Sequence, residues 1–262
     1  MKLGCLLLTA CAVGPVAHVG PVTATTTVGE REFSCSQVGV LESTPAGQHF
    51  VVNPGWRPFA LSGRAAVGVL PALLLVGGGT PAQSGEVALC DLAGSVVTQR
   101  RVAEDLVYAV AIAPHEPVAA AACADGRVLL LALPDLSIAE RTWWRHGGPA
   151  VAVAFSPDGE LLASAGHDST ILIGRPADET APRALLDHTA AVTCLAWAPE
   201  GQLASGSRDG KVRLHDRSGR LLHTWQRLGG VVTRVTFHAG QLEYGVEGEP
   251  GWRPVAGVWI LP

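Results

Sequence analysis

Two stretches of the chain decide its fold: VAVAFSPDGELLASAGHDSTILI at residues 151–173 and VTCLAWAPEGQLASGSRDGKVRL at residues 192–214. Each contains three short segments rich in residues that favour β-strands. The first two segments are separated by a turn with proline and glycine, and the last two by a turn with aspartate. Asp209-Gly210 is a strong signal for a tight turn, because glycine reaches positive φ without steric cost. No segment combines a helix cap with an amphipathic helical period. The two stretches therefore predict consecutive antiparallel strands in an all-β fold.

The same plan recurs along most of the chain. Further copies begin at Ala109 and Val232, and a weaker copy begins at Ala66. One anchor of the repeat recurs every 40 to 43 residues, at Val69, Ile112, Phe155, Trp197 and Phe237. This spacing is typical of a four-stranded propeller blade. A second anchor, in the strand after the turn, adds one blade before these five, at Val38, Val87, Val128, Ile171, Val212 and Val258. Six blades are expected.

Specific motifs give the repeat a family resemblance. SPDG and APEG form the first turn in the two clearest copies, and SAGHD and SGSRDG lead into the second. His146 and His188 precede the first strand. The pattern resembles the WD-repeat family of β-propellers, well over residues 100–240 and weakly toward both ends. The tryptophan of the family's signature dipeptide is missing, because His215-Asp216 and Gly174-Arg175 stand in its place.

The resemblance implies a structural hydrogen-bond network in each complete blade, made of a histidine, a serine or threonine, the hairpin aspartate and the tryptophan. By position, the matching residues are His146, Ser164 and Asp168 in the fourth blade, and His188, Ser205 or Ser207, and Asp209 in the fifth. The missing tryptophan leaves both networks incomplete. The strand pattern is unaffected by this departure.

The expected architecture is a single β-propeller over residues 1–262, with about six four-stranded antiparallel blades. The blades are expected at approximately 13–52, 62–101, 107–143, 149–187, 190–226 and 231–262. Within the first blade the expected strands are 15–19, 22–28, 36–42 and 48–52. The last blade lacks a fourth strand, and the apolar segment 2–11 is expected to supply it, because an open sheet edge is an unpaired template.

The start of the chain also has a competing interpretation. Lys2, the apolar run after it and Cys11 resemble a bacterial lipoprotein signal with its lipidated cysteine. The apolar stretch is at the short end for a signal-peptide core. The two interpretations make opposite demands, because a cleaved signal would leave the last blade open. We prefer the strand, which explains the terminus and the truncated blade together.

Composition and motifs exclude several classes of function. Apolar residues make up 48% of the chain, charged residues 16%, and the formal net charge is -4, so no broad attraction to nucleic acid or anionic membrane is implied. The six cysteines lack the spacing of a zinc or redox pair and are interpreted as small buried hydrophobes in a reducing compartment. Enzyme motifs are absent, and the histidine–aspartate pairs are assigned to structural positions of the repeat. We therefore expect no catalytic, cofactor-binding or metal-ligating residues.

The motif PGWRP occurs twice and carries the hypothesis for partner binding. Both copies are expected in loops on the same face of the propeller, where tryptophan and arginine are well suited to recognition. The candidate residues, with three further residues from the same expected face, are Trp56, Arg57, Trp144, Arg145, Arg208, Trp252 and Arg253. An aromatic patch ringed by arginines would suit an acidic or extended peptide. The alternative is that each tryptophan packs over its own blade.

The function expected from the resemblance is that of a cytoplasmic, non-catalytic scaffold that binds another protein or a peptide segment through a propeller face. Nucleic acid is not expected as a partner, and a membrane only if Cys11 is lipidated. Two alternatives stay open: an exported lipoprotein propeller that binds a component of the bacterial envelope, and an enzyme or metal-binding propeller that uses the central channel. The oligomeric state and the identity of the partner are not predicted.

Overall fold

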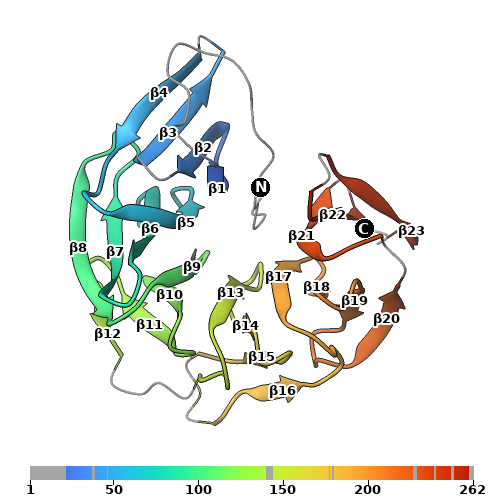
Figure 1. Ribbon diagram of the computed structural model, residues 1–262. Helices are drawn as coiled ribbons and strands as arrows, with labels where there is room; N and C mark the ends of the chain where they lie inside the picture. Colours follow the sequence, from blue (N-terminus) through green and yellow to red (C-terminus); the bar gives the residue numbers. More distant parts are fainter. Residues whose placement is uncertain are drawn as a thin grey trace.

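The computed structural model shows a β-propeller whose six sheets are arranged as blades around a central axis (Figure 1). It describes residues 22–36, 39–45, 47–139, 144–176, 178, 180–226, 229–238, 240–248 and 251–259. Within this part of the chain, five sheets have four antiparallel strands, and the sixth has three. No helix among these residues is long and apolar enough to cross a membrane.

Each blade is a meander whose first strand lies nearest the axis and whose last strand lies at the rim (Figure 1). Blades one to three contain β1 (Val22–Val28), β2 (Arg31–Ser36), β3 (Gly39–Thr44), β4 (Gly47–Val52); β5 (Arg57–Arg64), β6 (Leu73–Thr80), β7 (Ser84–Cys90), β8 (Val96–Ala103); and β9 (Val107–Ile112), β10 (Val118–Cys123), β11 (Val128–Ala132), β12 (Ser137–Ile138). Blades four to six contain β13 (Ala150–Phe155), β14 (Leu162–Gly166), β15 (Ile171–Gly174), β16 (Arg183–Leu185); β17 (Val192–Trp197), β18 (Leu203–Ser207), β19 (Val212–His215), β20 (Leu221–Trp225); and β21 (Val232–His238), β22 (Gln241–Val246), β23 (Arg253–Trp259).

Most repeat anchors lie in equivalent strands. Four anchors of the first set lie at or near the ends of inner strands: Ile112, Phe155, Trp197 and Phe237. Five anchors of the second set lie in the third strand of their blade: Val87, Val128, Ile171, Val212 and Val258. Val38 falls outside the described residues. The 40-to-43-residue period of the sequence therefore corresponds to one blade in the second half of the ring.

Blade one differs from the expected strand assignment. Val22–Val28 was expected as the second strand, but it forms the inner strand β1, and Arg31–Ser36, which was not expected to be a strand, pairs with it as β2. The reason is the turn at Gly29, whose φ of +63° reverses the chain directly after Val28. The expected strand 15–19 and the expected closing strand 2–11 lie outside the described residues.

Blade two begins earlier than expected, and its first anchor was wrong. The inner strand β5 spans Arg57–Arg64, whereas Val69 lies beyond it at the tip of a hairpin closed by Val67 and Leu70. Val69 is 99% exposed, which no core anchor would be. The apolar composition of residues 65–72 therefore reflects a projecting turn, which sequence periodicity could not distinguish from a strand.

The hydrophobic core consists of five clusters, each between two consecutive blades. Strand β10 shows how one strand serves two of them. Ala119 and Ala121 pack toward blade two, whereas Ala120 and Ala122 pack toward blade four. Alternate side chains of a strand point to opposite faces, and both faces of a blade are covered. The run of alanines in β10 therefore allows neighbouring blades to approach closely.

Candidate functional site: the histidine face

One face of the propeller carries both histidines of the repeat, and we call it the histidine face. It is formed by the loops between blades and by the turns between second and third strands, at residues 53–56, 81–83, 104–106, 124–127, 145–149, 167–170, 186–191, 208–211, 229–231, 247–248 and 251–252. The opposite face carries the remaining turns. All seven candidate partner-binding residues lie in or directly beside the loops of the histidine face.

In blade four, the structure brings together the three residues assigned by the family resemblance. His146 Nε2 lies 2.9 Å from Ser164 Oγ, and His146 Nδ1 lies 3.1 Å from Asp168 Oδ1. The backbone N–H of Gly147 donates to Asp168 Oδ2 at 2.7 Å. Burial would raise the pKa of Asp168, but hydrogen bonds from Gly147 and Thr170 hold it below its usual value. The imidazole and the carboxylate therefore join the loop before β13 to the turn after β14.

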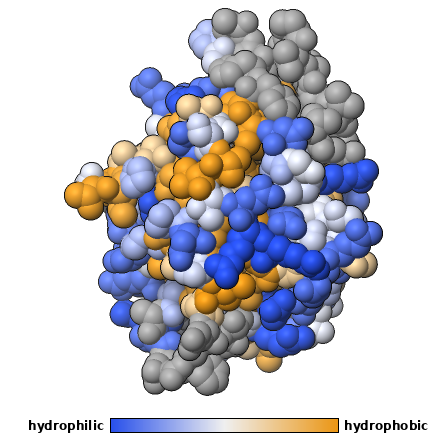
Figure 2. All heavy atoms as spheres, turned by 90° about the vertical axis from the view of Figure 1, so that its left-hand side faces the viewer, coloured by the Kyte–Doolittle hydropathy of each residue, from blue (hydrophilic) through white to orange (hydrophobic). Residues whose placement is uncertain are grey.

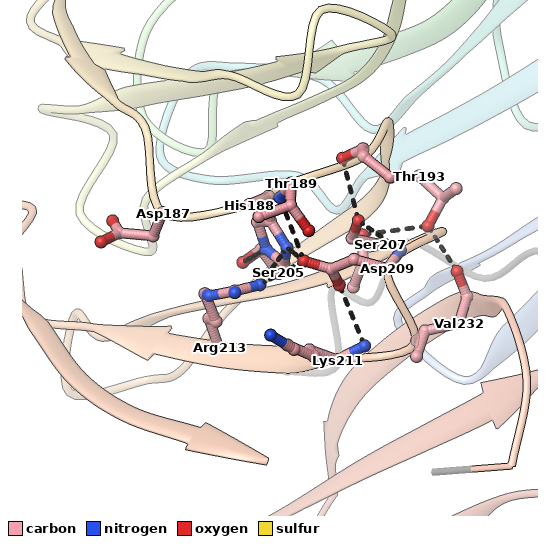
Figure 3. Close-up of polar contacts among 12 residues, drawn as sticks. Asp187, His188, Thr189, Thr193, Ser205, Ser207, Asp209, Lys211, Arg213 and Val232 are labelled. Carbon is pink, nitrogen blue, oxygen red and sulfur yellow. Dashed lines mark hydrogen bonds and ion pairs between the residues drawn. The ribbon is translucent and has the colours of Figure 1, made fainter. Parts of the chain in front are cut away.

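Blade five has the same contacts and one more. His188 Nε2 lies 2.8 Å from Ser205 Oγ, and His188 Nδ1 lies 3.1 Å from Asp209 Oδ2. Arg213 donates to the same Asp209 oxygen at 2.8 Å and also contacts His188 Nδ1. Figure 3 shows these four side chains turned toward one another. The arginine is 4% exposed, so its charge depends on Asp209 for compensation.

Burial and the nearby Arg213 change the pKa values of His188 and Asp209. Burial lowers the pKa of His188 to about 4, and the positive charge of Arg213 contributes to the shift. Burial would raise the pKa of Asp209, but hydrogen bonds from Arg213 and from the Thr189 backbone lower it to about 2. At neutral pH the histidine is neutral, and the ion pair is between Arg213 and Asp209. His188, Asp209 and Arg213 already bind one another, so we assign them a structural role in blade five.

Two serines were possible partners of His188, and the structure separates their roles. Ser205 contacts the histidine, whereas Ser207 Oγ donates to the Ala190 carbonyl at 3.0 Å and accepts from the Asp209 backbone N–H at 3.0 Å. Ser207 therefore holds the hairpin turn against the loop between blades.

The missing tryptophan is replaced by a different contact. His215 stands at its position in blade five, and its Nε2 lies 3.0 Å from Asp187 Oδ2. Its Nδ1 is buried and has no hydrogen-bond partner in the described part of the chain. Sequence reasoning missed both Arg213 and this pair. The available signal was a charged residue inside a short buried strand, since Arg213 interrupts the apolar pattern of β19.

The three candidate tryptophans do not form an exposed aromatic patch. Trp144 is only 4% exposed and belongs to the core between blades three and four, so it cannot contact a partner directly. Trp56 is half-buried against the core between blades one and two. The ring of Trp252 lies under the Arg234 guanidinium, whose carbon is 4.9 Å from the ring centroid. The hypothesis of an aromatic patch is therefore wrong for Trp144, and the other two rings pack largely on their own blades.

The candidate arginines of the histidine face are more exposed to solvent than the candidate tryptophans. Arg57, Arg145, Arg208 and Arg253 are all exposed. In the described residues, no hydrogen bond or ion pair involves the side chains of Arg57, Arg145, Arg208 or Lys211. Lys211 was not among the sequence candidates. Four cations of this face are thus available to an external ligand.

Most carboxylates of the same face are already engaged within the chain. Their partners are His146 for Asp168, Arg213 for Asp209, His215 for Asp187, Arg127 for Asp125, Arg101 for Glu104, and the backbone of Ala82 for Asp105. Opposite charges that are paired cancel at a distance, whereas unpaired charges do not. Arginines therefore compensate the charges of Asp209, Asp125 and Glu104, whereas Asp168, Asp187 and Asp105 are held by histidines or backbone N–H groups and keep their negative charge.

A β-bulge near the start of every inner strand adds a second feature beside the axis. The ladder register shifts around one residue per blade: Thr23, Phe59, Tyr108, Val151, Thr193 and Thr233. The last five belong to none of the core clusters between blades, and Tyr108 is 38% exposed. Bulges redirect a side chain out of the alternation of the strand. We call Phe59, Tyr108 and Val151, the three apolar residues at these positions, the apolar arc; they lie near the starts of the inner strands of three consecutive blades.

Metal-binding chemistry has no support in the part of the chain that the structure describes. No group of three histidine, cysteine, aspartate or glutamate residues there could hold a metal ion. Cys35, Cys90, Cys123 and Cys194 are buried and unbridged, as the sequence predicts for small hydrophobic residues. Burial raises the pKa of Cys90 and Cys123 to about 12, so these thiols are unreactive near neutral pH.

Comparison with known proteins agrees with this architecture. Residues 140–173 and 181–216, which include the networks of blades four and five, match the family model described as WD domain, G-beta repeat. The chain is similar to actin-interacting protein 1-2 of Arabidopsis thaliana, with 32% identity over 62% of the chain and 26% of that protein. It is also similar to actin-related protein 2/3 complex subunit 1 of Schizosaccharomyces pombe, with 31% identity over 52% of the chain and 42% of that protein. A third relative is the APC/C activator protein CDC20 of Saccharomyces cerevisiae, with 30% identity over 34% of the chain and 14% of that protein.

The chain thus spans less than half the length of each of these relatives. The matched segments fall in the half of the ring where the blade period is most regular. The chain is thus a β-propeller with two repeats that match the WD domain, G-beta repeat family, in blades four and five.

Proposed function

We propose that this propeller is a non-catalytic scaffold that binds an extended, acidic segment of another protein on its histidine face. The observation that carries the proposal is a group of basic side chains on this face that have no partner within the described residues. They are Arg57, Arg145, Arg208 and Lys211, whereas Asp209, Asp125 and Glu104 are paired with arginines. Charged groups arranged in this way attract a partner of opposite sign and orient it.

The apolar arc makes the site more specific than an electrostatic patch. Phe59 lies two residues after Arg57 on β5, so an aromatic ring and an unpaired guanidinium are presented together. A segment that carries acidic and apolar residues would satisfy both. The names of the three relatives describe an interaction with another protein, membership of a protein complex or activation of one, which supports a protein partner. We place the protein in the cytoplasm, the location expected from its sequence.

Charge reversal on the histidine face tests the proposal. Proteins are captured from source cells with the purified chain, and the affinity of a recovered partner is measured for wild type and for the double variant Arg57→Glu, Arg208→Glu. We expect the double variant to bind about tenfold or more weakly, and wild-type binding to weaken as salt is raised. Arg175→Glu on the opposite face is the matched control, because Arg175 is also exposed and lies outside the histidine face.

Two results would contradict the proposal. One is a partner whose affinity is the same for wild type and the double variant. The other is loss of binding in Arg175→Glu alone, which would move the binding surface from the histidine face to the opposite face.

A further inference from the structure

The outer strand of blade two differs from the other outer strands of the ring. β8 has eight residues, whereas β4 has six, β12 two, β16 three and β20 five. Natural sheets commonly keep edge strands short, since a long edge exposes backbone groups that can pair with another chain. β8 is therefore the outer strand with the longest available backbone, apart from any contribution of residues that the structure does not describe.

The outer edge of β8 is open. The strand order of the sheet is β5-β6-β7-β8, so β8 pairs only with β7. Among the described residues, no other segment hydrogen-bonds to the backbone of Val97–Arg100. In an antiparallel strand, alternate residues direct both their N–H and C=O groups to the same side. The ladder with β7 shifts register near both ends of β8, so this alternation is unbroken over Thr98–Arg101, where the outward groups can form a ladder with an added strand.

The side chains of β8 divide the edge into an apolar part and a basic part. Val96 and Val97 are 44% and 50% exposed. Figure 2 shows this side of the molecule, with hydrophobic residues exposed among hydrophilic ones. At the other end of the strand, Arg101 is bound to Glu104 and to the Gln83 carbonyl. Arg100 is exposed and makes no ion pair in the described residues, and its charge also reaches the Asp135 carboxylate of the next blade.

We propose that the outer edge of β8 binds an extended segment of a partner protein as a fifth strand of blade two, and that this segment carries apolar residues opposite Val96 and Val97 and acidic residues opposite Arg100. Strand addition obtains its affinity from main-chain hydrogen bonds and its specificity from alternate side chains. This surface lies on the rim and is separate from the histidine face, so the inference does not depend on the function proposed above.

Charge argues for an acidic partner and against a second copy of this chain. Antiparallel pairing of two β8 edges would bring Arg100 and Arg101 of one copy close to the same residues of the other. Like charges on neighbouring strands destabilise pairing, whereas opposite charges stabilise it. The arginines therefore act against self-association while they favour an acidic strand.

A synthetic peptide provides the test. An eight-residue fluorescein-labelled peptide that alternates valine and glutamate is titrated with the full chain at low salt, and binding is followed by fluorescence anisotropy. We expect saturable binding by wild type, at least fivefold weaker binding by Arg100→Glu, and little binding of a peptide with lysine in place of glutamate. Arg175→Glu, which makes the same charge change on the opposite face, should bind as wild type does, and Arg208→Glu reports any binding of the peptide to the histidine face. Hydrogen exchange should slow across Val96–Ala103 when the peptide is saturating.

The outcomes separate this inference from the proposed function. Binding that is lost in Arg208→Glu and kept in Arg100→Glu places the peptide on the histidine face and overturns the strand addition. Absence of binding, equal binding of the lysine peptide, or unchanged exchange across β8 also overturns it. A dimer of the free protein whose formation slows exchange in β8 would show that a second copy occupies the edge, and it would overturn the acidic partner.

Discussion

Asp209 is the residue on which the polar contacts of blade five converge. Its carboxylate accepts hydrogen bonds from the Arg213 side chain and from the Thr189 backbone N–H, and it also contacts His188 Nδ1. Removing one partner of a buried ion pair leaves an uncompensated charge, which costs about 3–5 kcal/mol. We expect Asp209→Ala to lower the free energy of unfolding by about that amount in urea denaturation.

Asp168→Ala is the matched control for this prediction. Asp168 has the equivalent position in blade four, but in the described residues no arginine is paired with it, and its side chain is more exposed than that of Asp209. Its loss should cost about 1–3 kcal/mol, the usual range for leaving buried donors unsatisfied. Equal losses for the two variants would contradict the central role given to Arg213.

The lowered pKa of His188 predicts how stability depends on pH. Its pKa is about 4 in the folded protein, against an ordinary value of 6.5 for histidine. Between these values the unfolded chain binds a proton that the folded chain does not, so stability falls as pH falls from 6.5 toward 4. The lowered pKa of Asp209, about 2, acts with the same sign below about pH 4.

Denaturation of wild type and His188→Gln at several pH values measures this effect. The variant should be less stable at neutral pH, because it loses contacts of His188, but its stability should fall less steeply between pH 6.5 and 4. An unchanged slope in the variant would show that His188 is not the group responsible.

At the scale of single elements, β18 shows how closely blades pack. A Cβ added at Gly206 would lie 2.5 Å from Val232 Cγ1 and 2.7 Å from Cys194 Sγ. Val232 belongs to β21 of the next blade, so a side chain at Gly206 would push two blades apart. Overpacking of this kind costs about 1–3 kcal/mol or more. We expect Gly206→Val to lower the thermal midpoint clearly, whereas Gly230→Ala, where the nearest atom is 3.8 Å away, should change it little.

The position of β5 leads to a second prediction at this scale. Leu75 is fully buried in β6, whereas Val69 is 99% exposed in the hairpin before it. In urea denaturation, Leu75→Ala should lower the free energy of unfolding by about 2–5 kcal/mol. The free energy of unfolding of Val69→Ala should stay within about 0.5 kcal/mol of wild type. A large loss in Val69→Ala would restore the strand assignment based on periodicity and contradict the observed register.

At the scale of the whole molecule, closure of the ring depends on what pairs with blade six. We propose that residues 2–11 supply its fourth strand, as the sequence suggests. Proline cannot donate to a ladder, so Leu6→Pro should lower the thermal midpoint if this segment is paired. Intact mass and membrane partitioning after expression in a bacterium test the alternative. An unprocessed chain supports the closing strand, whereas a lipidated product that starts at Cys11 would contradict it.

Local patterns predicted much of the second half of the ring. The turn motifs of blades four and five, and the positions of their histidines, serines and aspartates, lie where the repeat places them. In blades one and two the same reasoning failed at Arg31–Ser36 and at Val69. There the turns after β1 and β5 lack aspartate, and an apolar hairpin has the composition of a strand.

The sequence alone determined the all-β class and the number of blades, because alternation and turn chemistry are local properties of the chain. The histidine–serine–aspartate positions came from the family resemblance. The tertiary structure decided which tryptophans are buried, that Arg213 joins Asp209, and which arginines of the described residues are left without partners. Burial and ion pairing depend on residues that other strands and other blades bring together. For this reason the charge of the histidine face and the open edge of β8 became visible only in the folded ring.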